Sequence, residues 1–87
     1  MDKADRSRIL IVDDIEENLK VLTDTLVQDG YHPLQAKSGE RAIQIAQVAR
    51  PDLILLDIRM PGMDGFETIA ALKADGRTRD IPVIFIS

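Results

Sequence analysis

Three aspartates follow apolar runs of the sequence. Asp13 and Asp14 come directly after residues 9–12, which read ILIV, and Asp57 comes directly after residues 53–56, which read LILL. A carboxylate at the end of an apolar run is costly to bury unless a cation, a metal ion or hydrogen-bond donors pair with it. The rest of the chain must therefore supply a partner for these acids.

The chemistry open to such a cluster is metal-assisted phosphoryl transfer. Clustered carboxylates repel one another, and a divalent cation among them relieves that repulsion. Mg²⁺ suits a set of oxygen ligands because it retains waters and accepts phosphate oxygens. A carboxylate beside Mg²⁺ can itself attack a phosphoryl group and become an aspartyl phosphate. We interpret Asp57 as that nucleophile.

The elements that must bring these acids together are short apolar runs alternating with longer segments of helical period. Strands are expected at residues 8–13, 32–37, 52–57 and 81–86. The first helix has an apolar stripe of Ile15, Leu19, Leu22 and Leu26. The helix ends are expected at Gly30, at Ser38 as an N-cap, at Arg50 and Pro51, and near Asp75 and Gly76. The order β-α-β-α-β-α-β predicts one α/β domain, residues 1–87, around a parallel sheet.

Ligands of open parallel sheets bind beyond the carboxyl ends of the strands. Asp13, Asp14 and Asp57 should therefore meet at one edge, together with Ser87, which follows the apolar run 83–86. Ser87 would donate a hydrogen bond to a new phosphoryl oxygen and move toward it. The runs 9–12, 53–56 and 83–86 lack alternation, which predicts central strands covered on both faces, and the more polar HPLQAK predicts an edge strand.

Composition removes several functional classes. The chain has 87 residues, a net charge of −4, no cysteine and no basic cluster, so disulfides, a zinc-thiolate site and direct nucleic-acid binding are not expected. The apolar runs are too short to cross a bilayer, and the polar start MDKADRSR does not resemble a signal peptide. We therefore expect a cytoplasmic protein without membrane contact.

Three motifs resemble the receiver domain of two-component response regulators. They are VDD at 12–14, LLDIRMPGMDG at 55–65 and PVIFIS at 82–87, and they span almost the whole chain. The resemblance implies a flavodoxin-like three-layer α/β sandwich and phosphorelay signalling. It implies as partner a sensor histidine kinase or a histidine phosphotransfer protein. No enzyme activity is implied beyond intrinsic autophosphorylation and autodephosphorylation.

The same resemblance assigns roles to single residues. It implies Mg²⁺ as cofactor, bound by Asp13, Asp14, Asp57 and the backbone carbonyl of Arg59. It also implies that Asp57 is the phosphoacceptor and that Ser87 is the switch hydroxyl. Asn18, in VDDIEENLKVL, is similar to receivers of multidomain regulators and hybrid histidine kinases.

The chain departs from the family pattern after its fourth strand. Family receivers have five βα units, so the fourth helix, the fifth strand with its lysine and the fifth helix have no counterpart here, and Lys73 cannot take that lysine's role. The expected sheet is a truncated one of order 2-1-3-4, with residues 83–86 at an open edge. The alternative function is therefore a fragment that forms homo-oligomers or domain swaps through this edge, without phosphotransfer.

Two of the acids also have structural interpretations. Asp14 followed by Glu17 fits an N-cap with a capping box, which we weigh equally with metal ligation. Asp64, just before Gly65 and Phe66, is interpreted as part of a turn into the third helix.

Overall fold

The computed structural model of this chain describes residues 7–86. Strands and helices alternate through them as β1 (Arg8–Val12), α1 (Glu16–Gln28), β2 (His32–Ala36), α2 (Gly39–Ala49), β3 (Leu53–Leu56), α3 (Gly65–Ala74) and β4 (Val83–Phe85). This is the order that the apolar runs predict. Each strand begins and ends within two residues of its expected bounds.

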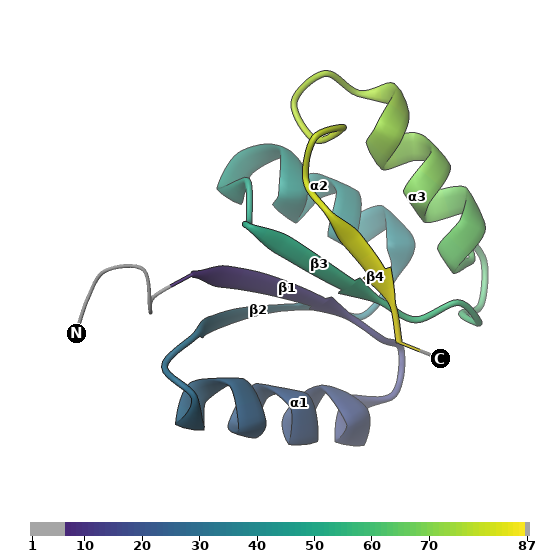
Figure 1. Cartoon of the computed structure of the whole chain (residues 1–87). Coiled ribbons are helices and arrows are strands. Elements are labelled where there is room, and N and C mark those ends of the chain that lie inside the picture. The colour runs from purple at the N-terminus through teal and green to yellow at the C-terminus, as the bar shows by residue number, and fades with distance from the viewer. Residues whose placement is uncertain (1–6, 87) are drawn as a thin grey trace.

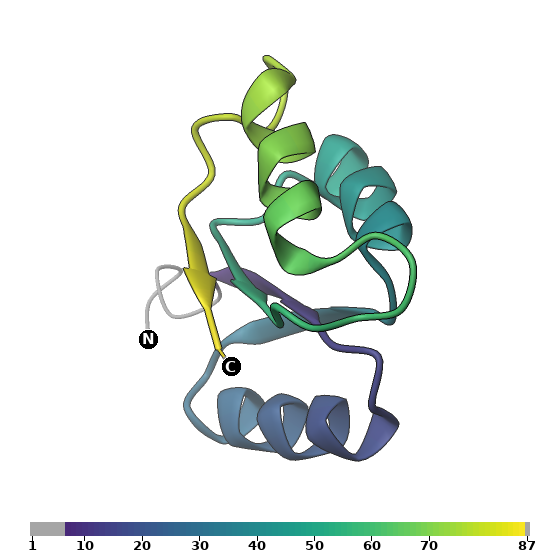
Figure 2. The same cartoon turned by 90° about the vertical axis from the view of Figure 1, so that its right-hand side faces the viewer.

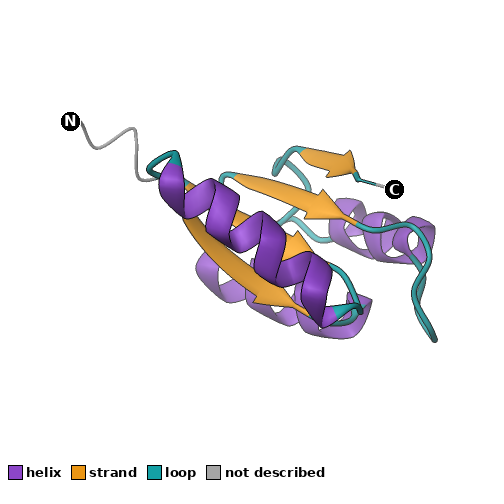
Figure 3. Ribbon diagram, turned by 90° about the horizontal axis from the view of Figure 1, so that it is seen from below, coloured by secondary structure: helices purple, strands orange, loops and turns teal. Residues whose placement is uncertain are grey.

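The four strands form one parallel sheet in the order β2-β1-β3-β4. Helix α1 lies on one face, and α2 and α3 lie on the other (Figure 1). Seen from the α1 side, α1 runs across the β2–β1 half of the sheet, and β4 lies outside the part that α1 covers (Figure 3). The predicted three-layer α/β fold is confirmed, as is the order 2-1-3-4.

The core lies between the sheet and the α2–α3 layer. Leu10, Ile54 and Leu56 are fully buried there. The facing residues of α2 are the small Ala42 and Ala46, which let that helix pack close to the strands. On the opposite face α1 contributes a buried Leu19. β1 is therefore covered on both faces, as its unbroken apolar run predicts.

β4 is not the doubly covered strand that its apolar run predicts. It pairs with β3 alone, at the end of the sheet, and Ile84 and Phe85 are 51% and 36% exposed. That prediction is wrong because an unbroken apolar pattern does not specify which neighbours cover a strand, and α1 covers the β2–β1 half only. The edge position expected from the family resemblance is confirmed.

The ends of α2 follow the local signals in the sequence. Ser38 is the N-cap, and its hydroxyl oxygen accepts a hydrogen bond from the backbone N–H of Arg41 at 3.1 Å. Arg50 ends the helix in the left-handed conformation, with φ 47°, directly before Pro51. Both predicted ends are confirmed.

The helices of residues 7–86 are short. The longest, α1, has 13 residues and is about 20 Å long, against the roughly 30 Å of a hydrocarbon core. None of the helices in this part of the chain has the length and apolar character of a membrane span.

Candidate functional site

The ladder of the central strands continues one residue past their assigned ends. Val12 of β1 lies opposite Leu56 of β3, and the N–H of Asp57 donates to the carbonyl of Val12 at 2.9 Å. On the other side of β1, the N–H of Asp13 donates to the carbonyl of Ala36 at 3.1 Å. Asp13 and Asp57 therefore start from neighbouring, hydrogen-bonded positions at the carboxyl edge of the sheet.

The three aspartates form one cluster at this edge. Carboxylate oxygens of Asp13, Asp14 and Asp57 all lie within 4.8 Å of one another. Asp13 and Asp57 are 3% and 6% exposed, and Asp14 is more exposed than either. Two unit charges at this separation repel by about 3 kcal/mol at an effective dielectric constant near 20. Oxygen-only donors at such spacing fit a small, hard divalent cation such as Mg²⁺.

The carboxylate of Asp13 is held by the start of α1. Its Oδ1 accepts a hydrogen bond from the backbone N–H of Ile15 at 2.9 Å, and its Oδ2 accepts one from Nδ2 of Asn18 at 3.1 Å. This contact of Asn18 was not predicted from the sequence. The signal available was an amide in the first turn of a helix that begins directly after the acidic pair.

The capping interpretation of Asp14 is wrong. α1 begins at Glu16, its N-cap is Ile15, and no side chain caps it. Asp14 therefore lies one residue too early to reach the helix amides, and its carboxylate lies near Asp13 and Asp57 instead. Ile15, expected within the apolar stripe of the helix, is 50% exposed at its start.

The start of α3 packs directly on the backbone of Asp57. The N–H of Gly65 donates to the carbonyl of Ile58 at 2.8 Å, and a Cβ placed on Gly65 would lie 2.5 Å from the backbone oxygen of Asp57. Only glycine fits this approach without a shift of backbone. Asp64 caps α3 in a capping box with Glu67, so its predicted structural role is confirmed.

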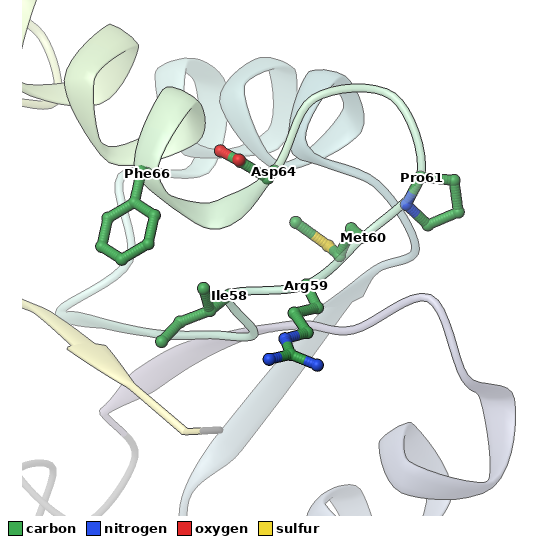
Figure 4. Close-up of a pocket in the computed structure, with 6 residues that line it drawn as sticks. All are labelled: Ile58, Arg59, Met60, Pro61, Asp64 and Phe66. Atoms are coloured by element: carbon green, nitrogen blue, oxygen red, sulfur yellow. The ribbon is translucent and has the colours of Figure 1, made fainter.

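The loop that follows Asp57 borders an open hollow. Figure 4 shows the side chains around it, which are those of Ile58, Arg59, Met60, Pro61, Asp64 and Phe66. Arg59 is exposed, and the metal-binding role of its backbone carbonyl stays a prediction. Ser87 lies outside the described residues. The residue before it, Ile86, donates its N–H to the carbonyl of Leu56 at 3.0 Å, beside the end of β3.

Lys73 makes its hydrogen bonds away from the acidic cluster. Its ammonium group donates to the backbone carbonyls of Arg79 and Ile81, both at 2.9 Å, in the connection that leads into β4. That connection precedes the amino end of β4, whereas the aspartates lie at the carboxyl edge. Lys73 therefore stabilises the α3–β4 connection, and it lies away from the acidic cluster, consistent with the expectation that it cannot replace the family's fifth-strand lysine.

Comparison with known proteins gives concordant matches. Residues 9–87 match the family described as the response regulator receiver domain. The response regulator PleD of Caulobacter vibrioides is 47% identical over 81 residues, which are 93% of this chain and 18% of PleD. Protein PilH of Pseudomonas aeruginosa is 40% identical over 81 residues, which are 93% of this chain and 67% of PilH.

Solved structures agree with the sequence matches. The crystal structure of the N-terminal domain of a response regulator receiver protein from Methanoculleus marisnigri JR1 superposes with a TM-score of 0.91 at 43% identity. The match covers 93% of this chain and 66% of that one. The chain thus spans less than a fifth of PleD and about two thirds of its shorter relatives.

Proposed function

This chain belongs to the response regulator receiver domain family, and from that premise we propose that it accepts a phosphoryl group on Asp57 in a two-component phosphorelay. One observation carries the proposal: three carboxylates lie within 4.8 Å of one another at the carboxyl ends of β1 and β3. Such a cluster is unfavourable without a cation, and a cation there favours phosphate chemistry.

The proposed reaction is a transfer between two side chains. A carboxylate oxygen of Asp57 attacks the phosphorus of a phosphohistidine on a sensor histidine kinase or a histidine phosphotransfer protein. The new bond from phosphorus to oxygen forms as the bond from phosphorus to the imidazole nitrogen breaks, and the nitrogen keeps the electron pair. The backbone hydrogen bond of Asp57 to Val12, with Gly65 packed behind it, fixes the position of the nucleophile.

Asp13, Asp14 and Asp57 would hold Mg²⁺, together with the backbone carbonyl of Arg59. When bound, Mg²⁺ would offset the negative charge of the carboxylates and of the transferring phosphoryl oxygens. We also propose that Ser87 donates its hydroxyl proton to a phosphoryl oxygen on Asp57, as the switch residue of the family does. These assignments extend the family membership to single residues.

The wider expectations are part of the same proposal. The protein would have no turnover of its own beyond intrinsic autophosphorylation and autodephosphorylation, and it would work in the cytoplasm beside its kinase. The net charge of −4 supports the absence of direct nucleic-acid binding.

The test is intact-mass detection of the full chain after incubation with MgCl₂ and a small-molecule acyl phosphate. We expect a gain of one phosphoryl mass in the natural chain and none in Asp57→Asn or in the presence of EDTA. Asp57→Asn should keep the fold, with equal or higher stability, because one repelling charge leaves the cluster. Asp24→Asn, the same chemical change on the exposed side of α1, is the matched control and should be labelled normally. Labelling retained in Asp57→Asn would contradict the proposal.

Self-association through β4 is the second candidate function, and its support is the exposure of Ile84 and Phe85 on an edge strand. The β4 edges of two copies of the chain could pair, or the copies could exchange elements there, and either arrangement would bury these side chains. We expect concentration-dependent oligomers on a sizing column with light scattering. A strictly monomeric sample that melts cooperatively would show that this expectation is wrong.

A further inference from the structure

Asn18 makes a contact that the proposed reaction does not use. Its Nδ2 donates to Oδ2 of Asp13 at 3.1 Å, while the N–H of Ile15 donates to Oδ1 of the same carboxylate at 2.9 Å. Each oxygen of Asp13 therefore has a donor from a fixed direction. Two donors on opposite oxygens restrict rotation of a carboxylate more than one donor does.

The backbone of Asn18 is itself fixed. Its N–H donates to the carbonyl of Ile15 at 3.1 Å, in the first turn of α1. The side chain of Asn18 is thus attached to a rigid helical turn and reaches back toward the end of β1. This geometry couples the orientation of Asp13 to the start of the helix.

Asn18 also stands at the border between the buried acid and the surface. Asp13 is 3% exposed, whereas Asn18 is exposed. The two residues line one hollow together with Val21, Leu22 and Ile86. The amide therefore supports Asp13 from the α1 side, and Asp14 and Asp57 approach its carboxylate within 4.8 Å.

We propose that Asn18 is a positioning residue of the Mg²⁺ site. Its amide holds the carboxylate of Asp13 in the orientation that a metal ligand needs. The inference rests on the proposed function, because it concerns the same acidic cluster. An ionised carboxylate offers about four lone-pair sites, so two donors leave acceptor capacity for a cation. Without the amide, Asp13 would have to lose rotational freedom when the metal binds, and affinity would fall.

The first measurement is a MgCl₂ titration of the full chain followed by NMR amide shifts. Asn18→Ala should raise the dissociation constant for Mg²⁺ roughly tenfold. This is the lower end of the effect expected when a residue that orients a metal ligand is lost. Asn18→Leu keeps approximately the shape of the side chain without its donor and should weaken binding equally. Gln28→Ala removes a similar neutral amide from the last residue of α1 and should leave the constant unchanged. If the alanine variant does not fold, the leucine variant carries the test.

The second measurement separates positioning from a general structural role. With an acyl phosphate as donor, the Mg²⁺ concentration for half-maximal phosphorylation should rise about tenfold in both Asn18 variants. The rate at saturating Mg²⁺ should stay close to that of the natural chain, since the metal then holds Asp13 itself. A lower maximal rate with an unchanged Mg²⁺ requirement would overturn the inference.

Two further outcomes separate the positioning role of Asn18 from the proposed phosphoryl acceptance on Asp57. If the natural chain binds Mg²⁺ and is phosphorylated, and both Asn18 variants bind Mg²⁺ with the same constant, the positioning role is wrong and the proposed function stands. If the natural chain neither binds Mg²⁺ nor gains a phosphoryl group, the proposed function fails, and the positioning role fails with it.

Discussion

The carboxyl ends of β1 and β3 and the edge strand β4 are built in opposite ways. At the first, Asp13 and Asp57 are buried, and the backbone N–H of each continues the hydrogen-bond ladder of the sheet. At the second, apolar side chains such as Ile84 lie half exposed on a strand with one neighbour. The acidic cluster thus depends on the central strands and the loops that leave them, and β4 contributes little to its geometry.

An aromatic contact joins the edge strand to the helix layer. The rings of Phe66 and Phe85 lie 5.3 Å apart between centroids, tilted by 57°, and join the start of α3 to the end of β4. Figure 2 shows β4 at the side of the sheet, with α3 on one face of the sheet and α1 on the other. Because β4 is covered from one face only, its stability should be lower than that of β1.

The largest effect should come from the core of the central strands. Leu10→Ala removes a fully buried side chain from β1 and should lower the free energy of unfolding by about 2–5 kcal/mol, a large part of a small domain's stability. Ile84→Ala, on a half-exposed residue of β4, should lower it by roughly 1 kcal/mol. Urea denaturation followed by circular dichroism measures both. Equal losses would remove the contrast between the two regions.

A smaller effect is expected where α3 meets Asp57. Gly65→Ala places a Cβ against the backbone of Asp57 and Ile58 and should lower the free energy of unfolding by about 1–3 kcal/mol, with weaker phosphoryl acceptance. Gly76→Ala, in the connection to β4, meets no atom within 4 Å and should change stability by no more than about 0.5 kcal/mol. Urea denaturation and intact-mass labelling would show both effects. A harmless Gly65→Ala would mean that the contact with Asp57 is loose.

The smallest effect concerns an ion pair in the connection to β4. Hydrogen bonds from the side chain and backbone of Arg77, and the charge of Arg77, hold the pKa of the Asp75 carboxyl well below its usual range. The unfolded chain therefore takes up this proton first as the pH falls. The stabilisation is present above about pH 4, the ordinary pKa of aspartate, and is lost as the pH falls further toward the folded-state pKa.

In Asp75→Asn the free energy of unfolding should therefore fall slightly less steeply between pH 5 and pH 2 than in the natural chain. Above pH 5 the two proteins should show nearly the same dependence on pH. The effect is small because the pair is partly exposed and screened by solvent. Urea midpoints measured across this pH range in both proteins provide the check. If the urea midpoints of both proteins change identically with pH, the Asp75–Arg77 pair makes no measurable contribution to stability.

Much of the fold was predictable because parallel sheets impose simple rules. Unbroken apolar runs such as residues 9–12 specify strands, and the meeting of carboxyl ends brings Asp13 and Asp57 together whatever the loops do. The open position of β4 was not predictable from its own residues, since an apolar run does not specify its neighbours. It followed instead from the family resemblance.

Contacts that depend on the exact start of a helix were harder to predict. A shift of one residue moved the N-cap of α1 from Asp14 to Ile15 and left Asp14 within the acidic cluster. The same start placed Asn18 where its amide reaches Asp13. Sequence patterns place helix ends only to within a few residues, and here that margin decides which side chains touch.

The backbone hydrogen bonds of Asp13 and Asp57 have a consequence for the lifetime of the site. Because both N–H groups donate to carbonyls of neighbouring strand ends, they are protected by the same pairing that closes the middle of the sheet. Amide protons of such groups exchange with solvent mainly when that part of the structure opens. Fraying of the loops alone would leave these two protons in place, so the backbones of Asp13 and Asp57 should separate only when the central sheet itself opens.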